Sequence, residues 1–444
     1  MKRSAWRYLW KSEDIRKKLL ISLLLLAIYR FAANVPVPGI DRAVIAQLTA
    51  LGGAQGNLVN LLDLLSGGSV SNFSILATGV YPYITAQIIL QLLQPIIPAL
   101  ERKMKEDPRA GRIWMEKWTI FLTIPMSAIS AFGQINIFNS MLGGTSSVVK
   151  NFGFTATTWL PTVATILSMM AGTMLGVWLG QLISEYGLRN QGLSLIIFAG
   201  IVSRIPVSLA ALLHSEGWWW LLIIVIIILV LTIFAIVYVQ QGRRNVPVMF
   251  PGRRIGNRMS MPVKSQLPLM VNMAGMIPII FAQSFLTFPA ILASFFLRSK
   301  TEWLANAATW VSTAFGGDSG WYPVMYFILV VAFCYFYTDV LFSQQNYGDN
   351  LKKQGAQIPG VTRGAPTQRY LTKVQRRITL PGALFLGLVA VMPYIFGAIL
   401  PTNQADIFLV SSAGLLIVVG TVRDTFQLIE TELKLHGYDD HLIS

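Results

Sequence analysis

The sequence has few charged residues for its length. Asp, Glu, Lys and Arg make up 12% of its 444 residues, whereas hydrophobic residues make up 54%. Soluble globular chains carry about 25% charged residues, and a soluble protein could not keep so apolar a surface in water. A disordered chain is excluded as well, because disorder requires low hydrophobicity. The composition therefore indicates an integral membrane protein.

Cysteine and histidine are also scarce. The single cysteine, Cys334, excludes an internal disulfide and any site built on paired cysteines. Three histidines leave too few ligands for zinc chemistry. The sequence contains no Walker loop, no His-Glu-x-x-His and no Gly-x-Ser-x-Gly. We therefore expect no catalytic residues, no cofactor and no metal, and we interpret the chain as a protein that is not an enzyme.

Apolar runs of about 20 residues are needed to cross a bilayer. The sequence contains ten, at approximately 18–34, 72–95, 118–138, 159–182, 192–213, 218–240, 268–297, 322–342, 380–400 and 407–426. With these spans, 29 of the 35 basic residues fall on one side of the membrane. The positive-inside rule assigns that side to the cytoplasm. An even number of spans then predicts that both termini are cytoplasmic.

Charged residues are almost absent from the predicted spans. Arg30 and Arg204 lie near the outer interface, where long side chains can snorkel to water. An ion-coupled transporter usually carries carboxylates or histidines at mid-membrane depth, but Asp339 falls near the cytoplasmic end of the eighth span. If this protein performs work, we expect the energy to come from a partner.

Two segments of the chain echo each other. "GVYPYITAQ" (79–87) and "GMIPIIFAQ" (275–283) share the pattern Gly-x-x-Pro-x-Ile-x-Ala-Gln, on the second span of each five-span half. A fainter Ile-x-x-Gly-x-Val echo links 197–202 with 417–422. An odd number of spans per half places the halves in opposite orientations, which makes an inverted repeat; coincidence among similar apolar helices is the alternative. Pro82 and Pro278 are predicted to kink their helices.

The segment between the first two spans is unusual. "NLVNLLDLLSGGSVS" (57–71) contains an apolar stretch that is too short to cross the membrane, and Ser-Gly-Gly-Ser interrupts it. This pattern favours a short re-entrant helix followed by a flexible hinge over an ordinary outer loop.

Several ordered segments resemble the SecY family along essentially the whole chain. They are "YRFAANVPVPGID" (29–41), "LLSGGSVSNFSILATGVYPYITAQIILQLLQ" (64–94), "NQGLSLIIFAGIVSRIP" (190–206), "LPLMVNMAGMIPIIFAQSF" (267–285), "DNLKKQGAQIPG" (349–360) and "LLIVVGTVRD" (415–424). The resemblance implies an all-α polytopic membrane protein with ten transmembrane helices in two inverted five-helix halves, plus a short re-entrant plug helix.

The implied organisation follows the chain in order. A cytoplasmic amphipathic N-terminus (1–17) precedes the N-terminal half (18–213), which contains the plug at about 57–71. The C-terminal half (214–426) carries cytoplasmic loops 241–267 and 343–379, and a cytoplasmic tail (427–444) follows.

The resemblance also implies a function, namely that of the central pore-forming subunit of a protein translocase. Such a gated, energy-passive channel moves unfolded secretory proteins across the cytoplasmic (plasma) membrane of a prokaryote and releases transmembrane segments laterally into it. A secondary transporter of a small solute is the alternative, since it too can have an inverted repeat. The implied partners are the SecE and SecG subunits, the SecA ATPase, the translating ribosome with its rRNA, signal sequences, unfolded preproteins, membrane lipids, YidC and accessory Sec proteins.

Carried over motif by motif, the resemblance assigns residues to four sites. The pore ring would comprise Val80, Ile84, Leu193, Ile197, Ile280 and Ile417. The plug would include Leu58, Leu61, Leu62, Asp63, Leu65, Gly67 and Gly68. The lateral gate would include Thr85 and Asn272, and docking of the motor or ribosome would use Arg253, Arg254 and Arg363.

Physical chemistry supports an apolar ring, although each of its members alone could be an ordinary packing or lipid-facing aliphatic. A sliding chain of any sequence should meet no fixed charge, and an idle apolar constriction dewets and resists ions. Two positions depart from the family's pattern. In "PGVTRG" (359–364), Thr362 occupies the usual arginine position and Arg363 is shifted by one; Ser130 stands where some relatives carry glutamine. The basic loop residues could alternatively be topogenic charge that binds anionic lipid.

Overall fold

The computed structural model describes residues 12–40, 73–94, 97, 100, 107–141, 148–149, 152–153, 158–189, 191–213, 218–251, 254–255, 258–259, 263–296, 301–315, 319–399 and 412–435. The predicted plug segment, 57–71, and Arg253 lie outside these residues.

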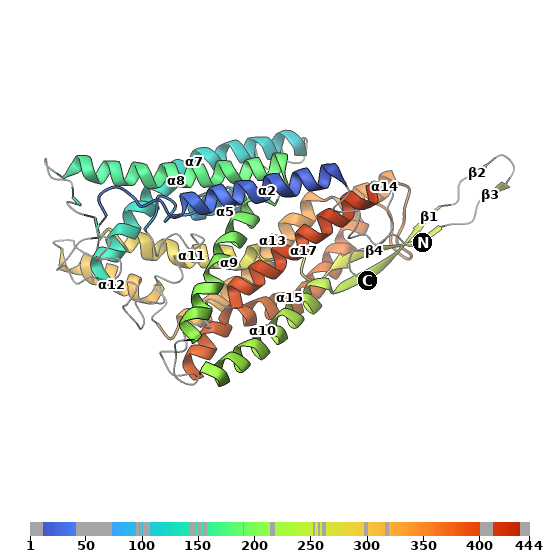
Figure 1. Ribbon diagram of the computed structural model, residues 1–444. Coiled ribbons are helices and arrows are strands. Elements are labelled where there is room, and N and C mark those ends of the chain that lie inside the picture. The colour runs from blue at the N-terminus through green and yellow to red at the C-terminus, as the bar shows by residue number, and fades with distance from the viewer. Residues whose placement is uncertain are drawn as a thin grey trace.

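Helices dominate the fold, as the apolar spans and the family resemblance imply (Figure 1). The first half contains α2 (Glu13–Ala32), α5 (Tyr81–Leu93), α7 (Pro108–Met141), α8 (Trp159–Tyr186) and α9 (Gly192–Leu213). The second half contains α10 (Trp218–Gln241), α11 (Ile277–Ser294), α12 (Glu302–Phe315), α13 (Tyr322–Gln344), α14 (Tyr347–Lys353), α15 (Ala365–Ile399) and α17 (Ser412–Leu435).

Four of the described helices, α7, α8, α13 and α15, are long and apolar enough to cross a membrane. Shorter apolar stretches lie at 192–203, 229–241 and 277–293. The hydrocarbon core of a bilayer offers no hydrogen-bond partners, and a helix pairs its backbone N–H and C=O groups internally. The structure therefore supports a multi-span membrane protein, and the number of ten crossings stays a prediction.

The two halves meet along two seams. Along the first, α11 packs against α5 and α7. Along the second, α9 packs against α17 and α10, and Lys18 at the start of α2 reaches Glu432 at the end of α17, with 2.6 Å between Nζ and Oε1. We call these the gate seam and the closed seam.

Loop 241–267 contains strands, so the prediction of an all-helical chain is incomplete. β1 (Arg243–Phe250) pairs antiparallel with β4 (Val263–Met270), and β2 (Arg254–Ile255) with β3 (Arg258–Met259). Val246 and Val248 alternate with exposed residues, the pattern of a half-buried strand. They pack in one core with residues of α13, α14 and α15. The two long loops of the second half thus form a single folded unit, which projects beyond the helices (Figure 1).

Three helical segments depart from the predicted boundaries. α14 lies inside loop 343–379, and α15 begins at Ala365, well before the predicted span at 380. α12 lies in a segment for which no helix was predicted. Its Trp303 and Trp310 are exposed and seven residues apart, hence on one helix face. Such tryptophans are typical of a membrane interface.

The echoed Gly-Pro segments have matching geometry, but the predicted kinks are wrong. Gly79 and Gly275 both have positive φ, 55° and 65°, and α5 and α11 each begin two residues later. Pro82 and Pro278 therefore lie in the first helical turn, where the missing N–H needs no partner. Glycine tolerates the left-handed backbone at no steric cost. Each segment starts a helix rather than bending one.

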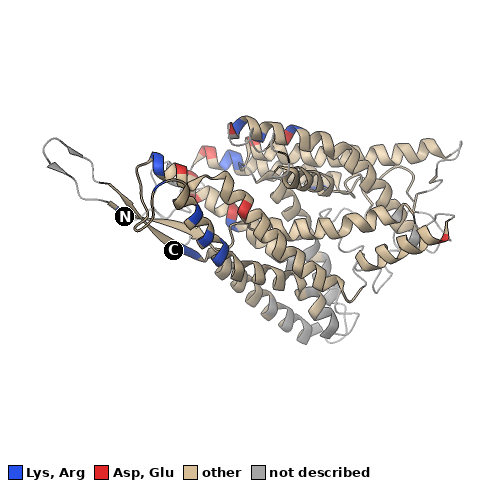
Figure 2. Ribbon diagram, turned by 180° about the vertical axis from the view of Figure 1, so that it is seen from behind, with Lys and Arg blue, Asp and Glu red and all other residues tan. Residues whose placement is uncertain are grey.

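Charged residues gather at one end of the helices, the end that carries β1 and β4 (Figure 2). Away from that end, Glu302 lies in the first turn of α12 and Arg30 in the last turn of α2. Asp339, the eighth-span carboxylate, lies at the charged end and accepts hydrogen bonds from Arg376 at 2.8–3.2 Å. This distribution agrees with the sidedness derived from the basic residues.

Candidate functional site

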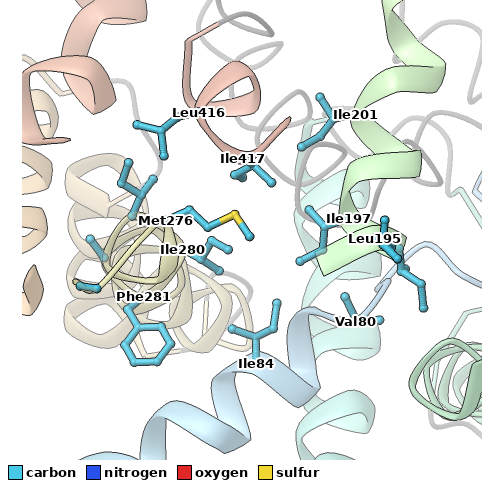
Figure 3. Packing of buried hydrophobic residues seen from close by; sticks show 14 of the residues in the cluster. Val80, Ile84, Leu195, Ile197, Ile201, Met276, Ile280, Phe281, Leu416 and Ile417 are labelled. Atoms are coloured by element: carbon cyan, nitrogen blue, oxygen red, sulfur yellow. The ribbon is translucent and has the colours of Figure 1, made fainter. Parts of the chain in front are cut away.

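A buried apolar cluster lies where helices of both halves converge. Figure 3 shows side chains that point toward a common centre from four helices: Ile84 from α5, Ile197 from α9, Ile280 from α11 and Ile417 from α17. Each of the four is at most 7% exposed. Val80 belongs to the same cluster, and Leu193 packs against it while partly buried. The structure thus brings all six predicted ring residues together.

The Gly-Pro helix starts position two of these residues. Ile84 and Ile280 both lie five residues after a glycine with positive φ, in the first turns of α5 and α11. The same register pairs Val80 with Met276, which is 7% exposed and reaches toward Ile280 and Ile417 in Figure 3. Met276 was not among the predicted ring residues, although the echo alone could have identified it.

Helices α9 and α17 supply the opposite side of the cluster. Ile197 and Ile417 occupy matching positions of the fainter echo, and both face the cluster. Ile201, one turn after Ile197, is 4% exposed and also belongs to it. Ile201 is a second lining residue that helical periodicity could have added. The resulting cluster is apolar, and most of its side chains are buried.

A polar vestibule adjoins the cluster toward the charged end. One pocket is lined by Leu193 of the ring together with Tyr83, Glu116, Gln181 and Glu185. A second shares Tyr83 and Glu116 and extends along α5 past Gln87, Gln91 and Gln94 to α13. Their volumes are about 390 and 320 Å³. Two pockets with polar side chains in their linings therefore lie beside the apolar cluster.

The predicted gate residues make hydrogen bonds within their own segments. Thr85 donates to the carbonyl of Tyr81, one turn earlier in α5. Asn272 bonds the N–H and the carbonyl of Gly275, which holds the turn that precedes α11. Both side chains are buried. Their participation in a gate stays a prediction.

A different residue bridges the gate seam. The Tyr81 hydroxyl donates to the Ser284 carbonyl across α5 and α11, at 3.1 Å. Tyr81 is 4% exposed, so this hydrogen bond is shielded from water. Sequence reasoning missed it because a backbone acceptor leaves no side-chain signature at position 284.

Close apolar packing completes the gate seam. A Cβ at Gly133 of α7 would lie 2.4 Å from Cγ2 of Ile291 of α11, so glycine alone permits this approach. Beside it, the rings of Phe132 and Phe295 lie 4.7 Å apart between centroids. No charged residue occurs in α11. The contacts that the described residues make along this seam are therefore neutral.

The predicted docking arginines lie at the charged end. Arg254 opens β2 in the ribbon that extends β1 and β4, and Arg363 is exposed beside Gly364, whose φ is 90°. Among the described residues, no group of three or more His, Cys, Asp or Glu is placed to hold a metal ion.

A family model for SecY matches residues 74–426. The chain belongs to the SecY family. Its similarity to curated SecY proteins extends over nearly its full length. It is 36% identical to the protein translocase subunit SecY of Streptomyces griseus, covering 99% of both chains. It is 35% identical to the same subunit of Chlamydia trachomatis, covering 98% of this chain and 96% of that one.

Solved structures share the SecY fold with this chain. A protein-conducting channel superposes with a TM-score of 0.60 at 16% identity, covering 98% of this chain and 99% of the other. The yeast Ssh1 complex bound to the 80S ribosome contains a chain with a TM-score of 0.58 at 13% identity, covering 97% and 95%. The predicted resemblance to the SecY family is confirmed, and the alternative of a small-solute transporter finds no support.

Proposed function

We propose that this chain is the channel subunit of a protein translocase, and that the cluster of Val80, Ile84, Leu193, Ile197, Ile280 and Ile417 is its pore ring. The carrying observation is that four helices from both halves direct aliphatic side chains at one centre (Figure 3). Met276 and Ile201 extend this lining. The side chains of the ring carry no charge and no hydrogen-bonding group. A translocating chain of any sequence can therefore pass without being held.

The same ring seals the idle channel. Five of its members are at most 7% exposed and Leu193 is partly buried, so the lining is almost entirely shielded from solvent. A narrow apolar passage resists ions because they would lose their hydration without compensation. The segment 57–71 would act as a plug beside the ring, as the family resemblance implies. The channel itself is passive, and we assign no catalytic residue to it.

The gate seam supplies the lateral exit. Among the described residues, it is held by the neutral hydrogen bond from Tyr81 to Ser284 and by the approach of Ile291 to Gly133. Beside it, the amide of Gln344 at the end of α13 donates to Gln94 at the end of α5, at 3.4 Å. Such a lock is weak enough for an arriving apolar segment to open through its own partitioning into lipid. Thr85 and Asn272 would shape the two flanks of this exit.

The charged end faces the cytoplasm of a prokaryote and docks the partners that drive transport. Arg254 and Arg363 lie on the two loops whose described residues form one folded unit, and Arg253 precedes Arg254 in the sequence. Six basic residues and no acid between 241 and 267 suit rRNA phosphates or an acidic protein surface. The ribosome-bound Ssh1 complex shares the fold, which supports the ribosome as a partner. SecE, SecG and SecA are expected by family resemblance.

Site-specific crosslinking tests the pore assignment. A photoreactive amino acid at Ile84, Ile197 or Ile280 should form an adduct with a secretory chain stalled during translocation. The same probe at the lipid-facing Ile223 or Ile227 of α10, which are 46% and 58% exposed, is the matched control. Equal adducts at the ring and control positions, or none at the ring, would contradict the assignment.

A further inference from the structure

A basic pocket opens at the charged end of α15, on the side that faces α13. Its volume is about 660 Å³, and its lining includes Tyr335, Arg369, Lys373, Arg376, Arg377 and Leu380. None of the residues assigned above to the pore ring, the gate seam or docking lines this pocket.

Most of the positive charge in this pocket is not neutralised. Arg376 is held by Asp339, with 2.8 Å between Nη2 and Oδ2. Among the described residues, Arg369, Lys373 and Arg377 have no acidic partner within ion-pair distance. All three are exposed. The pocket therefore has three cationic side chains without an acidic partner, which favours binding of an anion.

An apolar stripe continues from the pocket along α15. Leu380, Leu384 and Leu388 are 52%, 44% and 50% exposed and are spaced four residues apart. Residues at this spacing lie on one helix face, and Arg369 and Lys373 continue that face toward the charged end. On a helix long and apolar enough to cross the membrane, exposed leucines meet acyl chains while the cations lie at headgroup level.

We propose that this pocket binds the phosphate of an anionic phospholipid, whose acyl chains lie along Leu380, Leu384 and Leu388. Guanidinium groups bind phosphate oxygens with paired hydrogen bonds, and basic pockets beside membrane helices suit such headgroups. A water-soluble anion would use only the cations. The adjoining leucine stripe is the feature that favours a lipid over free phosphate, nucleic acid or an acidic protein.

Native mass spectrometry of the full-length protein, purified with its bound subunits, tests this proposal. Dioleoyl phosphatidylglycerol should be retained, and the triple variant Arg369→Gln, Lys373→Gln, Arg377→Gln should lose about tenfold or more in affinity. The matched control removes the same charge at the start of α7, by Arg109→Gln, Arg112→Gln and Lys117→Gln. Its affinity should change by less than about twofold.

Three ligand comparisons identify the source of the phosphate. Dioleoyl phosphatidylcholine has the same chains without net charge, and dihexanoyl phosphatidylglycerol has the same headgroup with short chains. Both should bind about tenfold more weakly. Inorganic phosphate should not displace the long-chain lipid.

Four results would overturn the proposal. The α7 control variant could lose as much lipid affinity as the pocket variant, or inorganic phosphate could displace the long-chain lipid. The pocket variant could retain the lipid but lose ribosome binding, or photoactivatable phosphatidylglycerol could label the unmodified protein only outside 369–388. The last measurement does not depend on the folding of any variant. Labelling within 369–388 would support the site.

Discussion

The two seams between the halves are held together by different means. Along the gate seam, α11 meets α5 and α7 through aliphatic and aromatic side chains and through the hydrogen bond from Tyr81 to Ser284. Along the closed seam, α9 continues through a short connection into α10, and a partly buried ion pair joins Lys18 to Glu432. In the part of the chain that the structure describes, the closed seam alone has both a chain connection and a charge pair. If the halves separate as we propose, we therefore expect them to do so along the gate seam.

A larger side chain at Gly133 should weaken the gate seam more than any other single change that we propose. In Gly133→Leu the new side chain would collide with Ile291 and force α7 away from α11. Overpacking of this kind costs about 1–3 kcal/mol, which shifts the balance toward an open gate by about 5-fold to more than 100-fold. We expect increased resting ion leak in proteoliposomes and improved secretion of a substrate with a weakened signal sequence.

Gly320→Leu is the control for that experiment. A Cβ at Gly320 would contact no other atom within 4 Å, at the start of α13. If both variants leak equally, the effect does not come from the gate seam.

The pore ring should be the next most sensitive region, because it is shared by both seams. Ile84→Ser with Ile280→Ser places hydroxyl groups in the constriction and widens it. We expect an increase of about tenfold in resting conductance, since a polar, wider passage hydrates more readily. Planar-bilayer recordings would measure it, with Ile223→Ser on the exposed face of α10 as control. An unchanged seal would contradict the role of the ring.

Loss of the ion pair in the closed seam should lower the stability of the protein rather than change its gating. Lys18→Gln or Glu432→Gln removes one partner of a pair whose side chains are 32% and 16% exposed. After allowance for solvent screening we expect a loss of about 1 kcal/mol in the free energy of unfolding. Thermal unfolding in detergent measures it, and the exchange Lys18→Glu with Glu432→Lys should restore most of the loss. A raised ion leak without lost stability would show that this seam also opens.

The smallest effect is expected at the hydroxyl of Tyr81. Tyr81→Phe removes only the hydrogen bond to the Ser284 carbonyl, worth about 0.5–1.5 kcal/mol. Secretion with a weakened signal sequence should improve by about 2- to 10-fold. Tyr83→Phe is the matched variant, because Tyr83 lines the vestibule rather than the gate seam. Equal effects of the two variants would exclude a specific role for the bridge.

The sequence alone predicts much of the apolar cluster that we propose as the pore ring. Two sequence echoes align Ile84 with Ile280 and Ile197 with Ile417, and the structure directs these four side chains at one centre. Met276 was missed although the same register pairs it with Val80. A methionine among aliphatics carries no local signal of facing a pore, and only the repeat itself could reveal it.

The remaining features depend on contacts between distant segments. Val246 and Val248 alternate as a strand requires, but β1 is fixed by pairing with β4 and by packing against residues of α14 and α15. Gly133 looks like any small residue of an apolar helix until Ile291, more than 150 residues later, is seen against it. Local sequence patterns carry no information about such long-range pairings.

The paired strands β1 and β4 also have a mechanical consequence. β1 follows α10 directly, and after β4 the chain enters α11 through the turn that Asn272 holds. The N–H of Val271 donates to the carbonyl of Gly242 at 2.9 Å, which closes the base of the two strands. The base of the two strands is therefore tied by hydrogen bonds directly to the turn that precedes α11, the helix that carries Ile280 and Ile291.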